Sequence, residues 1–496
     1  MEGEDDVNRS VIVIGAGIGG LSAGCFARIN GIDTKVFEMG TGPGGLCTAW
    51  KRNGYVFDGS IHHLAGTEEG SAPNDLWKAL GAFPADVVYS DELVTIKDAE
   101  GRSLRVFFDA DLLTQELKRI APEDGQMIDA YVDFSREFEH LDFTEMGFWK
   151  WSDWPSRLVK MIRVVKRGGA SMSEYAKRFH NPVLRRFFPT FQYNWTDIPV
   201  IAHLVIFAGC RQKRYGWYPG GSLAFSSAIA RRLTALGGEI HYRSEVEKIL
   251  VKGGRAVGVR LKSGESHYAD AVISNATEYA TMVKFLDGQY MDETQKAWFD
   301  HPVDAMRMGL NLSFGVNRDL SAEPPSLTLF AERPFEIAGV WRDCVTVQNH
   351  SFDPSMAPKG KSSLKVHYDT HYSYWEQLAN HPERYREEKE RIASTTLDQL
   401  EAFYPGIRGE IEAIDVATPL TTERFTGNGR GYGDPSVMNS KQMLRSMLHK
   451  PLAVSGLRSC YLIGQSVGGA GILGCASMGR NAVKALCKER GWKYQR

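Results

Sequence analysis

The chain has 496 residues, of which 43% are apolar and 24% are charged, and its formal net charge at pH 7 is -1. This is the composition of an ordinary soluble globular protein, and the length is too great for one hydrophobic core, so two or more lobes are expected. A charge balance this close to neutral gives no reason to expect a nucleic-acid partner.

Cysteine spacing and the N-terminal stretch further restrict the class of protein. Seven cysteines are scattered without a C-x-x-C pair, so neither a disulfide framework nor a zinc site is predicted, and no metal ligand set is expected. The stretch MEGEDDVNRS lacks the basic and apolar regions of a signal peptide, and no apolar run reaches the length of a spanning helix. A cytoplasmic protein is therefore predicted.

The first motif along the chain is a strand, a turn and a helix. RSVIVIG, residues 9–15, has the pattern of a strand buried on both faces. A helical segment follows over residues 21–32 and ends at Asn30-Gly31, and residues 33–40 form a second strand that carries Glu38. The order predicts a βαβ unit.

The turn of this unit spells G-x-G-x-x-G, and each glycine has a mechanical role. Gly15 permits the tight turn, Gly17 lets the backbone approach a pyrophosphate, and Gly20 lets helix and strand pack closely. The phosphates would lie at the helix N-terminus. Glu38 stands 18 residues after Gly20, where an acid accepts the ribose hydroxyls. A dinucleotide site is predicted.

A second glycine pair, Gly44-Gly45, follows Glu38 and offers more backbone N–H groups to the pyrophosphate. The fingerprint, the acid, the P-G-G sequence and then GYVFDG, residues 54–59, together resemble the FAD-dependent oxidoreductases of the phytoene desaturase, carotenoid isomerase and retinol saturase group. The resemblance implies that the cofactor is FAD rather than NAD. It also implies a Rossmann-type FAD-binding domain of the glutathione-reductase and amine-oxidase kind.

The middle block, residues 215–276, reads as turn, helix, strand, hairpin and strand. Residues 239–251 and 256–261 are predicted strands joined by a hairpin turn at Lys252-Gly253-Gly254-Arg255. The block resembles the segment in which the chain of the family's members re-enters the FAD domain. The resemblance implies that Val246 holds the adenine through backbone groups. Tyr218-Pro219-Gly220-Gly221 matches the family's turn before the helix.

A second G-x-G-x-x-G begins at Gly469 and ends at Gly474. Only 22 residues follow, too few for a second βαβ unit with its acid, so a second dinucleotide site is excluded. A strand over residues 460–464, a glycine turn and a helix over residues 474–488 are predicted instead.

The family resemblance implies that the start of this helix, with Gly471 and Ile472, faces the flavin of the same FAD. Gly464-Gln465 stands where many FAD enzymes have G-D, and glutamine still accepts and donates hydrogen bonds.

The predicted fold class is α/β, with an α+β substrate lobe interleaved. Residues 8–70, 216–285 and 455–496 are assigned to a discontinuous FAD-binding domain, and residues 71–215 and 286–454 to the substrate-binding domain. In the second part, TPLTTERFTGNGRGYG, residues 418–433, is the best match to the family.

Residues 147–167 combine three tryptophans, Trp149, Trp151 and Trp154, with a basic amphipathic segment. This pattern suits peripheral contact with a membrane surface, and it equally suits a solvated helix face whose tryptophans pack on the core.

No side-chain catalytic motif stands out, which fits a flavin that carries the hydride chemistry itself. His62 and His63 follow the FAD segment, so each is a candidate proton donor or acceptor near the ring, although a structural role is the other reading. Tyr218 is a third candidate, and Arg424 and Tyr432 are weaker ones, on resemblance alone.

The predicted function is an FAD-dependent oxidoreductase that desaturates, saturates or isomerises carbon–carbon bonds of a long apolar isoprenoid or polyene. With no second nucleotide site, electrons would come from or go to a diffusible partner such as a quinone, oxygen or a reductase. Two alternatives stay open: an amine-oxidase-like enzyme that shares the FAD lobe, and a non-catalytic FAD-binding escort protein.

Overall fold

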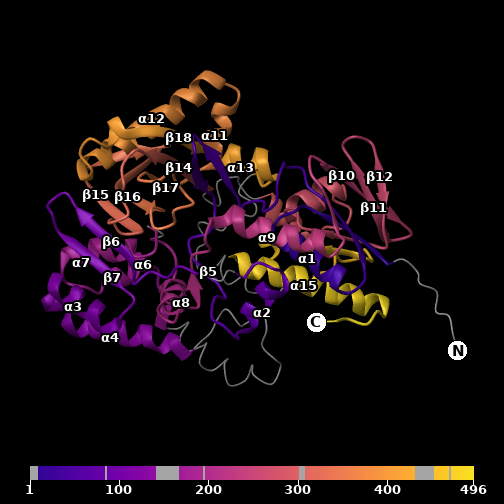
Figure 1. Ribbon diagram of the computed structural model, residues 1–496, viewed down its shortest axis with the longest axis horizontal. Helices are drawn as coiled ribbons and strands as arrows, with labels where there is room; N and C mark the ends of the chain where they lie inside the picture. The colour runs from indigo at the N-terminus through magenta and orange to yellow at the C-terminus, as the bar shows by residue number, and fades with distance from the viewer. Residues whose placement is uncertain are drawn as a thin grey trace.

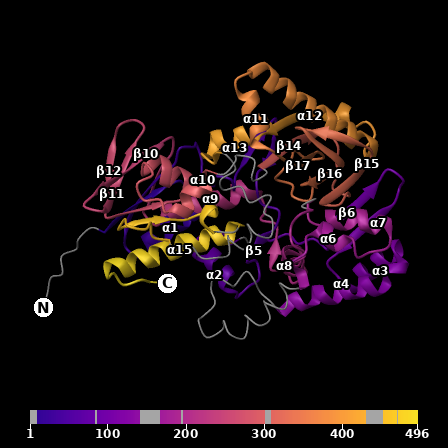
Figure 2. The same cartoon turned by 180° about the vertical axis from the view of Figure 1, so that it is seen from behind.

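The computed structural model describes residues 9–83, 86–140, 167–193, 196–300, 308–429, 452–468 and 471–495. Two lobes lie side by side in Figure 1: one surrounds a parallel sheet and contains both ends of the chain, and the other surrounds a larger mixed sheet. Figure 2 shows the same division from behind.

The first lobe is built on a five-stranded sheet in the order β19-β13-β1-β2-β9, and every neighbouring pair in it is parallel. Its strands come from distant parts of the chain: β1 (Ser10–Ile14), β2 (Asp33–Phe37), β9 (Glu239–His241), β13 (Ala271–Ser274) and β19 (Cys460–Leu462). The central strand β1 is almost entirely buried, as its continuous apolar run predicts. Strands from all three segments assigned to the FAD domain thus share one sheet, while the exact boundaries of the domains stay a prediction.

Helices cover one face of this sheet: α1 (Ile18–Ile29), α2 (Ala72–Ala79), α9 (Gly221–Ala235) and α15 (Gly471–Arg490). On the other face, Ile12 and Ile14 of β1 pack against apolar residues of the segment 246–261. Figures 1 and 2 both show α1 and α15 side by side, and Gly479 makes this approach possible. A Cβ atom on Gly479 would lie 2.3 Å from the carbonyl oxygen of Gly19. The predicted βαβ unit is confirmed, and so is the end of its helix at Asn30-Gly31. Helix α1 starts three residues earlier than expected.

The structure corrects one predicted strand. Residues 239–251 do not form a single strand: β9 ends at His241, and a new strand, β10 (Val246–Lys252), begins after a bend. Arg243 has φ 56°, and its N–H donates to the carbonyl of Gly40, so the backbone leaves the extended conformation there. The predicted hairpin at residues 252–255 is confirmed; it joins β10 to β11 (Arg255–Leu261), and β12 (Ser266–Tyr268) completes a three-stranded sheet.

The helix after the second glycine motif also differs from its prediction. It runs over Gly471–Arg490 rather than residues 474–488. The earlier start adds Leu473 to the buried face of the helix, and burial of apolar surface favours that extension.

The second lobe is built on a seven-stranded sheet in the order β18-β14-β17-β16-β15-β6-β7. Its strands are β6 (Glu92–Asp98), β7 (Ser103–Phe107), β14 (Met308–Val316), β15 (Ser326–Ile337), β16 (Val340–Asn349), β17 (Ser362–Thr370) and β18 (Ile411–Ala417). The first two come from before the middle block and the rest from after it, and the parallel pairing of β15 with β6 joins the two parts.

Helices of the second lobe form two groups on either side of this sheet. One group contains α3 (Ala110–Ile120), α4 (Gly125–Glu137), α6 (Met172–Ala176), α7 (Pro182–Phe187) and α8 (Val200–Arg211). The other contains α11 (Tyr372–Ala379), α12 (Pro382–Phe403) and α13 (Pro419–Thr426), with α12 packed on β15 and β18. A short helix, α10 (Glu293–Phe299), precedes β14. No helix in the described ranges is long and apolar enough to cross a membrane.

Two small antiparallel strand pairs join the lobes. β3 (Ala49–Arg52) and β4 (Tyr55–Asp58) pair with each other, and β4 packs on β14 and β17 of the second sheet. β5 (Leu64–Ala65) pairs with β8 (Tyr215–Gly216). Tyr55 is fully buried, and a Cβ on Gly315 would lie 2.5 Å from its ring, so only glycine lets the strands meet there.

The close packing of β1 and α1 gives a first prediction. A Cβ at Gly20 would lie 2.0 Å from the carbonyl oxygen of Gly15 and 3.2 Å from Val13 Cγ1. Because neither backbone nor sheet can yield, Gly20→Ala is expected to lower the free energy of unfolding by about 3 kcal/mol, measured by denaturant unfolding. Gly409→Ala is the control, since a Cβ at that position would have no atom within 4 Å. Equal stability of the two variants would contradict the packing role.

Candidate functional site

A groove runs along the carboxyl ends of β1, β2, β13 and β19, where α/β proteins bind their ligands. It brings together most of the residues predicted from sequence to bind the cofactor: Gly15, Gly17, Glu38, Gly44, Gly45, Val246, Gly464, Gln465, Gly471 and Ile472. Gly20 is the exception, because it packs helix against strand behind the groove.

The middle of the groove is lined by backbone. Gly17 is the N-cap residue of α1, and no side chain of the described residues caps that helix end. Gly44 lies alongside, with its N–H donating to the Ala16 carbonyl at 2.8 Å, and its φ of +111° favours glycine. A helix N-terminus without a side-chain cap, flanked by glycines, fits a pyrophosphate.

Glu38 lies at one end of the groove, directly after β2. Its two carboxylate oxygens accept hydrogen bonds from the N–H groups of Ala16 and Gly40, each at 2.7 Å. Burial raises the pKa of this carboxyl, and the two backbone hydrogen bonds oppose the rise. The acid is therefore fixed beside the glycine turn, and its lone pairs remain the acceptors that ribose hydroxyls need.

The other end of the groove is formed by the second glycine motif. Gly464 follows β19, Gln465 begins a short 3-10 turn, and Gly471 begins α15. The two glycine motifs meet there, since the Ser22 hydroxyl of α1 donates to the carbonyl of Ala476 at 2.7 Å. Both motifs line one groove, as predicted for a single cofactor; Gly469 lies outside the described residues.

Sequence reasoning missed Asn275, which lies between the two motifs. A Cβ on Gly17 would lie 2.6 Å from its Nδ2, one on Gly19 would lie 2.5 Å from its Oδ1, and Gly464 is also close. The residue directly follows β13, and the rule that ligands bind beyond the carboxyl ends of parallel strands would have found it.

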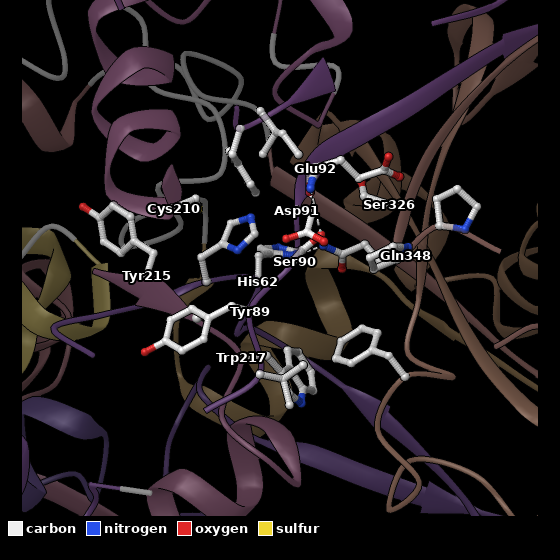
Figure 3. A pocket seen from close by; sticks show the side chains of 18 of the residues that line it. His62, Tyr89, Ser90, Asp91, Glu92, Cys210, Tyr215, Trp217, Ser326 and Gln348 are labelled. Carbon is white, nitrogen blue, oxygen red and sulfur yellow. Dashed lines mark hydrogen bonds between the residues drawn. The ribbon is translucent and has the colours of Figure 1, made fainter. Parts of the chain in front are cut away.

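A second cavity adjoins the groove at residues 60–63. Ser60 lines the groove, whereas Ile61, His62 and His63 line the second cavity, which Figure 3 shows from close by. Its other walls include aromatic side chains from both lobes: Tyr89, Phe108, Tyr193, Tyr215, Trp217, His350 and Phe352.

The carboxylate of Asp58 and its partner Ser222 fix the backbone of residues 60–61, where the chain passes from one cavity to the other. The carboxylate accepts hydrogen bonds from the N–H and the hydroxyl of Ser222 at 2.6 and 2.8 Å, and from the N–H of Ser60 at 3.0 Å. The Ser222 hydroxyl in turn accepts from the N–H of Ile61 at 2.8 Å. Burial raises the pKa of Asp58, while Lys365 and these hydrogen bonds oppose the rise.

The two histidines predicted near the ring do line the second cavity, and both are kept neutral. Burial, helped by the charge of Lys365, holds the pKa of His62 well below its usual range, and burial lowers that of His63 to about 4. The ring of His62 also packs at a tilt against that of Tyr193, with ring centroids 4.7 Å apart, and its Nδ1 is hydrogen-bonded to Gln348 Nε2.

His350 is a further site residue that the sequence did not indicate. It is 3% exposed, and burial lowers its pKa to about 3. Its ring lies 5.0 Å from that of Trp217, whose indole N–H donates to Asp353 at 2.7 Å. No local motif marks His350 or Gln348, because both reach the cavity from the second sheet.

The remaining candidates lie elsewhere. Tyr218 is not among the residues that line either cavity; it packs edge-to-face on Phe225 with centroids 5.2 Å apart. Arg424 lies over the ring of Phe425, while the next residues, 426–428, line the groove. Tyr432 and the tryptophan-rich segment (Trp149, Trp151, Trp154) lie outside the described residues.

A parallel sheet, a glycine turn at a helix N-terminus and an acid after the next strand together define a dinucleotide-binding fold. A model of the NAD(P)-binding Rossmann-like domain matches residues 13–80. Among solved structures, an oxidoreductase from Methanosarcina mazei is similar, with 20% identity, a TM-score of 0.60 and coverage of 96% of this chain and 100% of the other. Cyclohexylamine oxidase from Brevibacterium oxydans has 16% identity, a TM-score of 0.58 and coverage of 98% and 100%. The predicted α/β fold of the amine-oxidase kind is confirmed.

Relatives similar over most of the chain are carotenoid and retinoid enzymes. Chloroplastic prolycopene isomerase from Arabidopsis thaliana is 27% identical over 94% of this chain and 81% of its own length. Lycopene-forming phytoene desaturase from Pseudescherichia vulneris is 24% identical, over 83% and 85%. All-trans-retinol 13,14-reductase from Danio rerio is 24% identical, over 92% and 82%. The resemblance to the phytoene desaturase, carotenoid isomerase and retinol saturase group is confirmed.

The position of Glu38 predicts its effect on cofactor binding. Glu38→Gln replaces one acceptor by an NH2 group that faces a backbone N–H, so the affinity for added FAD should fall at least about tenfold. Titration of the cofactor-free protein, followed by quenching of flavin fluorescence, measures this. Glu247→Gln, at an exposed position on the neighbouring hairpin, should bind FAD like the parent. Unchanged affinity of the Glu38 variant would remove this residue from the site.

The neutral histidines predict how stability depends on pH. The pKa values of His63 and His350 are lower in the folded protein than the ordinary 6.5, so the unfolded chain binds more protons between about pH 4 and 6.5. Stability should therefore fall as the pH is lowered through this window, and each histidine contributes at most about 1.4 kcal/mol per pH unit. Thermal unfolding at pH 7 and pH 5 measures the loss, which His350→Gln should reduce and His381→Gln, at an exposed position, should not. Equal losses in the two variants would contradict the buried neutral state of His350.

Proposed function

We propose that the chain is an FAD-dependent oxidoreductase that acts on carbon–carbon single or double bonds of a long apolar isoprenoid or polyene. The observation that carries this proposal is that consecutive residues line the two cavities: Ser60 lines the dinucleotide groove, and Ile61, His62 and His63 line the cavity with aromatic walls. The similarity to carotenoid and retinoid enzymes over most of the chain supports the same substrate class.

FAD fits the groove better than a nicotinamide dinucleotide would. Glu38 and Val246 would hold the adenosine end, and Gly15, Gly17 and Gly44 the pyrophosphate. The groove continues past this turn to a second glycine motif, where Gln465 would hydrogen-bond the ribityl chain. When bound, FAD supplies the hydride chemistry.

The protein's own residues would then orient the substrate and exclude water. Gln348 donates to Nδ1 of His62, so the neutral imidazole carries its proton on Nε2. A neutral histidine is suited to hydrogen-bond the substrate or to accept a proton from it, and the same holds for His63. Electrons would be exchanged with a diffusible partner such as a quinone, oxygen or a reductase. Contact of residues 147–167 with a membrane surface is also proposed.

The charges around the second cavity argue against an amine substrate. A buried ammonium group is stabilised by an unpaired carboxylate or by aromatic faces. The first kind of partner is not offered by Glu92 or Glu323, because Glu92 is paired with Arg105 at 2.6 Å and Glu323 with Lys97 at 3.2 Å. Asp91, at the rim, is exposed and solvated. The amine-oxidase alternative is therefore less well supported than a neutral substrate.

The first experiment is anaerobic and tests the reaction itself. The FAD-loaded protein is reduced with dithionite, a polyene is added in detergent micelles, and the flavin spectrum and the products are followed. Reoxidation of the flavin with a saturated product indicates a saturase, and a rearranged double bond without reoxidation indicates an isomerase. New double bonds formed by the oxidised protein indicate a desaturase. An unchanged polyene with both the reduced and the oxidised protein, together with peroxide released from amines, would overturn the proposal in favour of the amine oxidase.

The role of His62 can be separated from FAD binding. His62→Phe keeps an aromatic ring beside Tyr193 but removes both ring nitrogens, so kcat should fall about 100-fold or more while the FAD content stays unchanged. Steady-state turnover and the flavin-to-protein absorbance ratio measure the two quantities. A normal kcat would assign His62 to packing alone.

A further inference from the structure

Buried polar atoms without a hydrogen-bond partner gather in the second cavity. Within the described residues, four such atoms belong to side chains that line it: His63 Nε2, Ser326 Oγ, Gln348 Oε1 and His350 Nδ1. Native proteins leave few buried polar atoms unpaired, and those that cluster in a cavity are partnered there by water or by a ligand. The cavity therefore has a polar section within its aromatic walls.

Two of these atoms come from directly opposed residues. Ser326 of β15 pairs in register with Gln348 of β16, so both side chains point to the same face of the sheet. Figure 3 shows both beside His62 in the cavity. The amide nitrogen of Gln348 is engaged with His62, which turns the unpaired Oε1 into a fixed acceptor.

The wall behind these atoms is rigid. Asp353 holds Trp217 through its indole N–H and also accepts from the N–H of Gly220 at 2.8 Å. The ring of Trp217 lies against that of His350, which is itself buried. These contacts hold the ring of His350, and with it the unpaired Nδ1, in place at the cavity wall.

The polar section is also uncharged. His63 and His350 are neutral at physiological pH because burial lowers their pKa values. The carboxylates of Glu92 and Glu323 are already paired with Arg105 and Lys97. An ionic group on the substrate would find no counter-charge among these residues.

We infer that the substrate is an isoprenoid alcohol, whose hydroxyl donates a hydrogen bond to Gln348 Oε1 and accepts one from the hydroxyl of Ser326. A hydrocarbon satisfies neither atom, and an aldehyde or ketone has no donor for Gln348 Oε1. This inference rests on the proposed function, since it assumes that the second cavity takes the substrate. It makes Gln348 and Ser326 the residues that select a hydroxylated polyene over a pure hydrocarbon.

Binding of two matched probes to the FAD-loaded protein tests the inference. All-trans-retinol and the hydrocarbon with CH3 in place of its CH2OH group are titrated in the same micelles, and quenching of tryptophan fluorescence gives both dissociation constants. The alcohol should bind at least about tenfold more tightly, because the hydrocarbon leaves buried polar atoms unpaired. Gln348→Leu should abolish this preference, mainly by weakening the binding of the alcohol.

Ser326→Ala removes one oxygen with little risk to folding and should reduce the preference part of the way. Gln289→Leu, on an exposed residue far along the chain from the cavity, controls for the exchange of glutamine for leucine and should keep the parent's preference. Equal binding of the two probes to the parent, or an unchanged preference in Gln348→Leu, would overturn the inference.

Turnover separates this failure from failure of the proposed function. If the reduced protein transforms the hydrocarbon as readily as the alcohol, the proposed function stands and the alcohol specificity is wrong. If neither probe binds or reacts although FAD is bound, both are wrong.

Discussion

The buried carboxylate of Asp58 is the constraint that sets the arrangement of the site. It joins the end of β4 to the start of α9, and its partner Ser222 also fixes the backbone of Ile61. A Cβ on Gly221 would lie 2.3 Å from Asp58 Oδ2, so the glycine before Ser222 is required for this contact. Since residues 60–63 pass from the groove to the second cavity at this point, Asp58 fixes the segment that lines both.

The same burial that brings the lobes together sets the chemistry of the second cavity. Histidines enclosed by aromatic rings lose their water and become neutral, because desolvation disfavours the charged form. Paired carboxylates at the outer end remove the remaining charge from the interior. The result is a cavity whose histidines are neutral and whose glutamates Glu92 and Glu323 are paired, which suits a neutral substrate with a single polar group.

The repeated glycine motif has a simple structural explanation. Both copies place a helix start at the carboxyl edge of one sheet, and Asn275 lies between them. Gly17 and Gly19 in the first copy, and Gly464 ahead of the second, avoid contact with the Asn275 side chain. One groove can thus use two similar sequences, with the first lining its middle and the second lining its far end.

Local sequence was enough to predict the dinucleotide groove and most of the elements around it, but not the second cavity. The strand, glycine turn and acid of residues 9–38 form a contiguous unit, so their spacing predicts both structure and ligand class. The same reasoning joined residues 239–251 into one strand, because nothing local shows that Arg243 must bend to meet the carbonyl of Gly40. The walls of the cavity come from separate segments that share no periodicity or spacing, among them His62, Trp217 and Gln348. Contacts between such segments depend on how the sheets and helices pack in three dimensions. This packing is a property of the folded chain that no local pattern encodes.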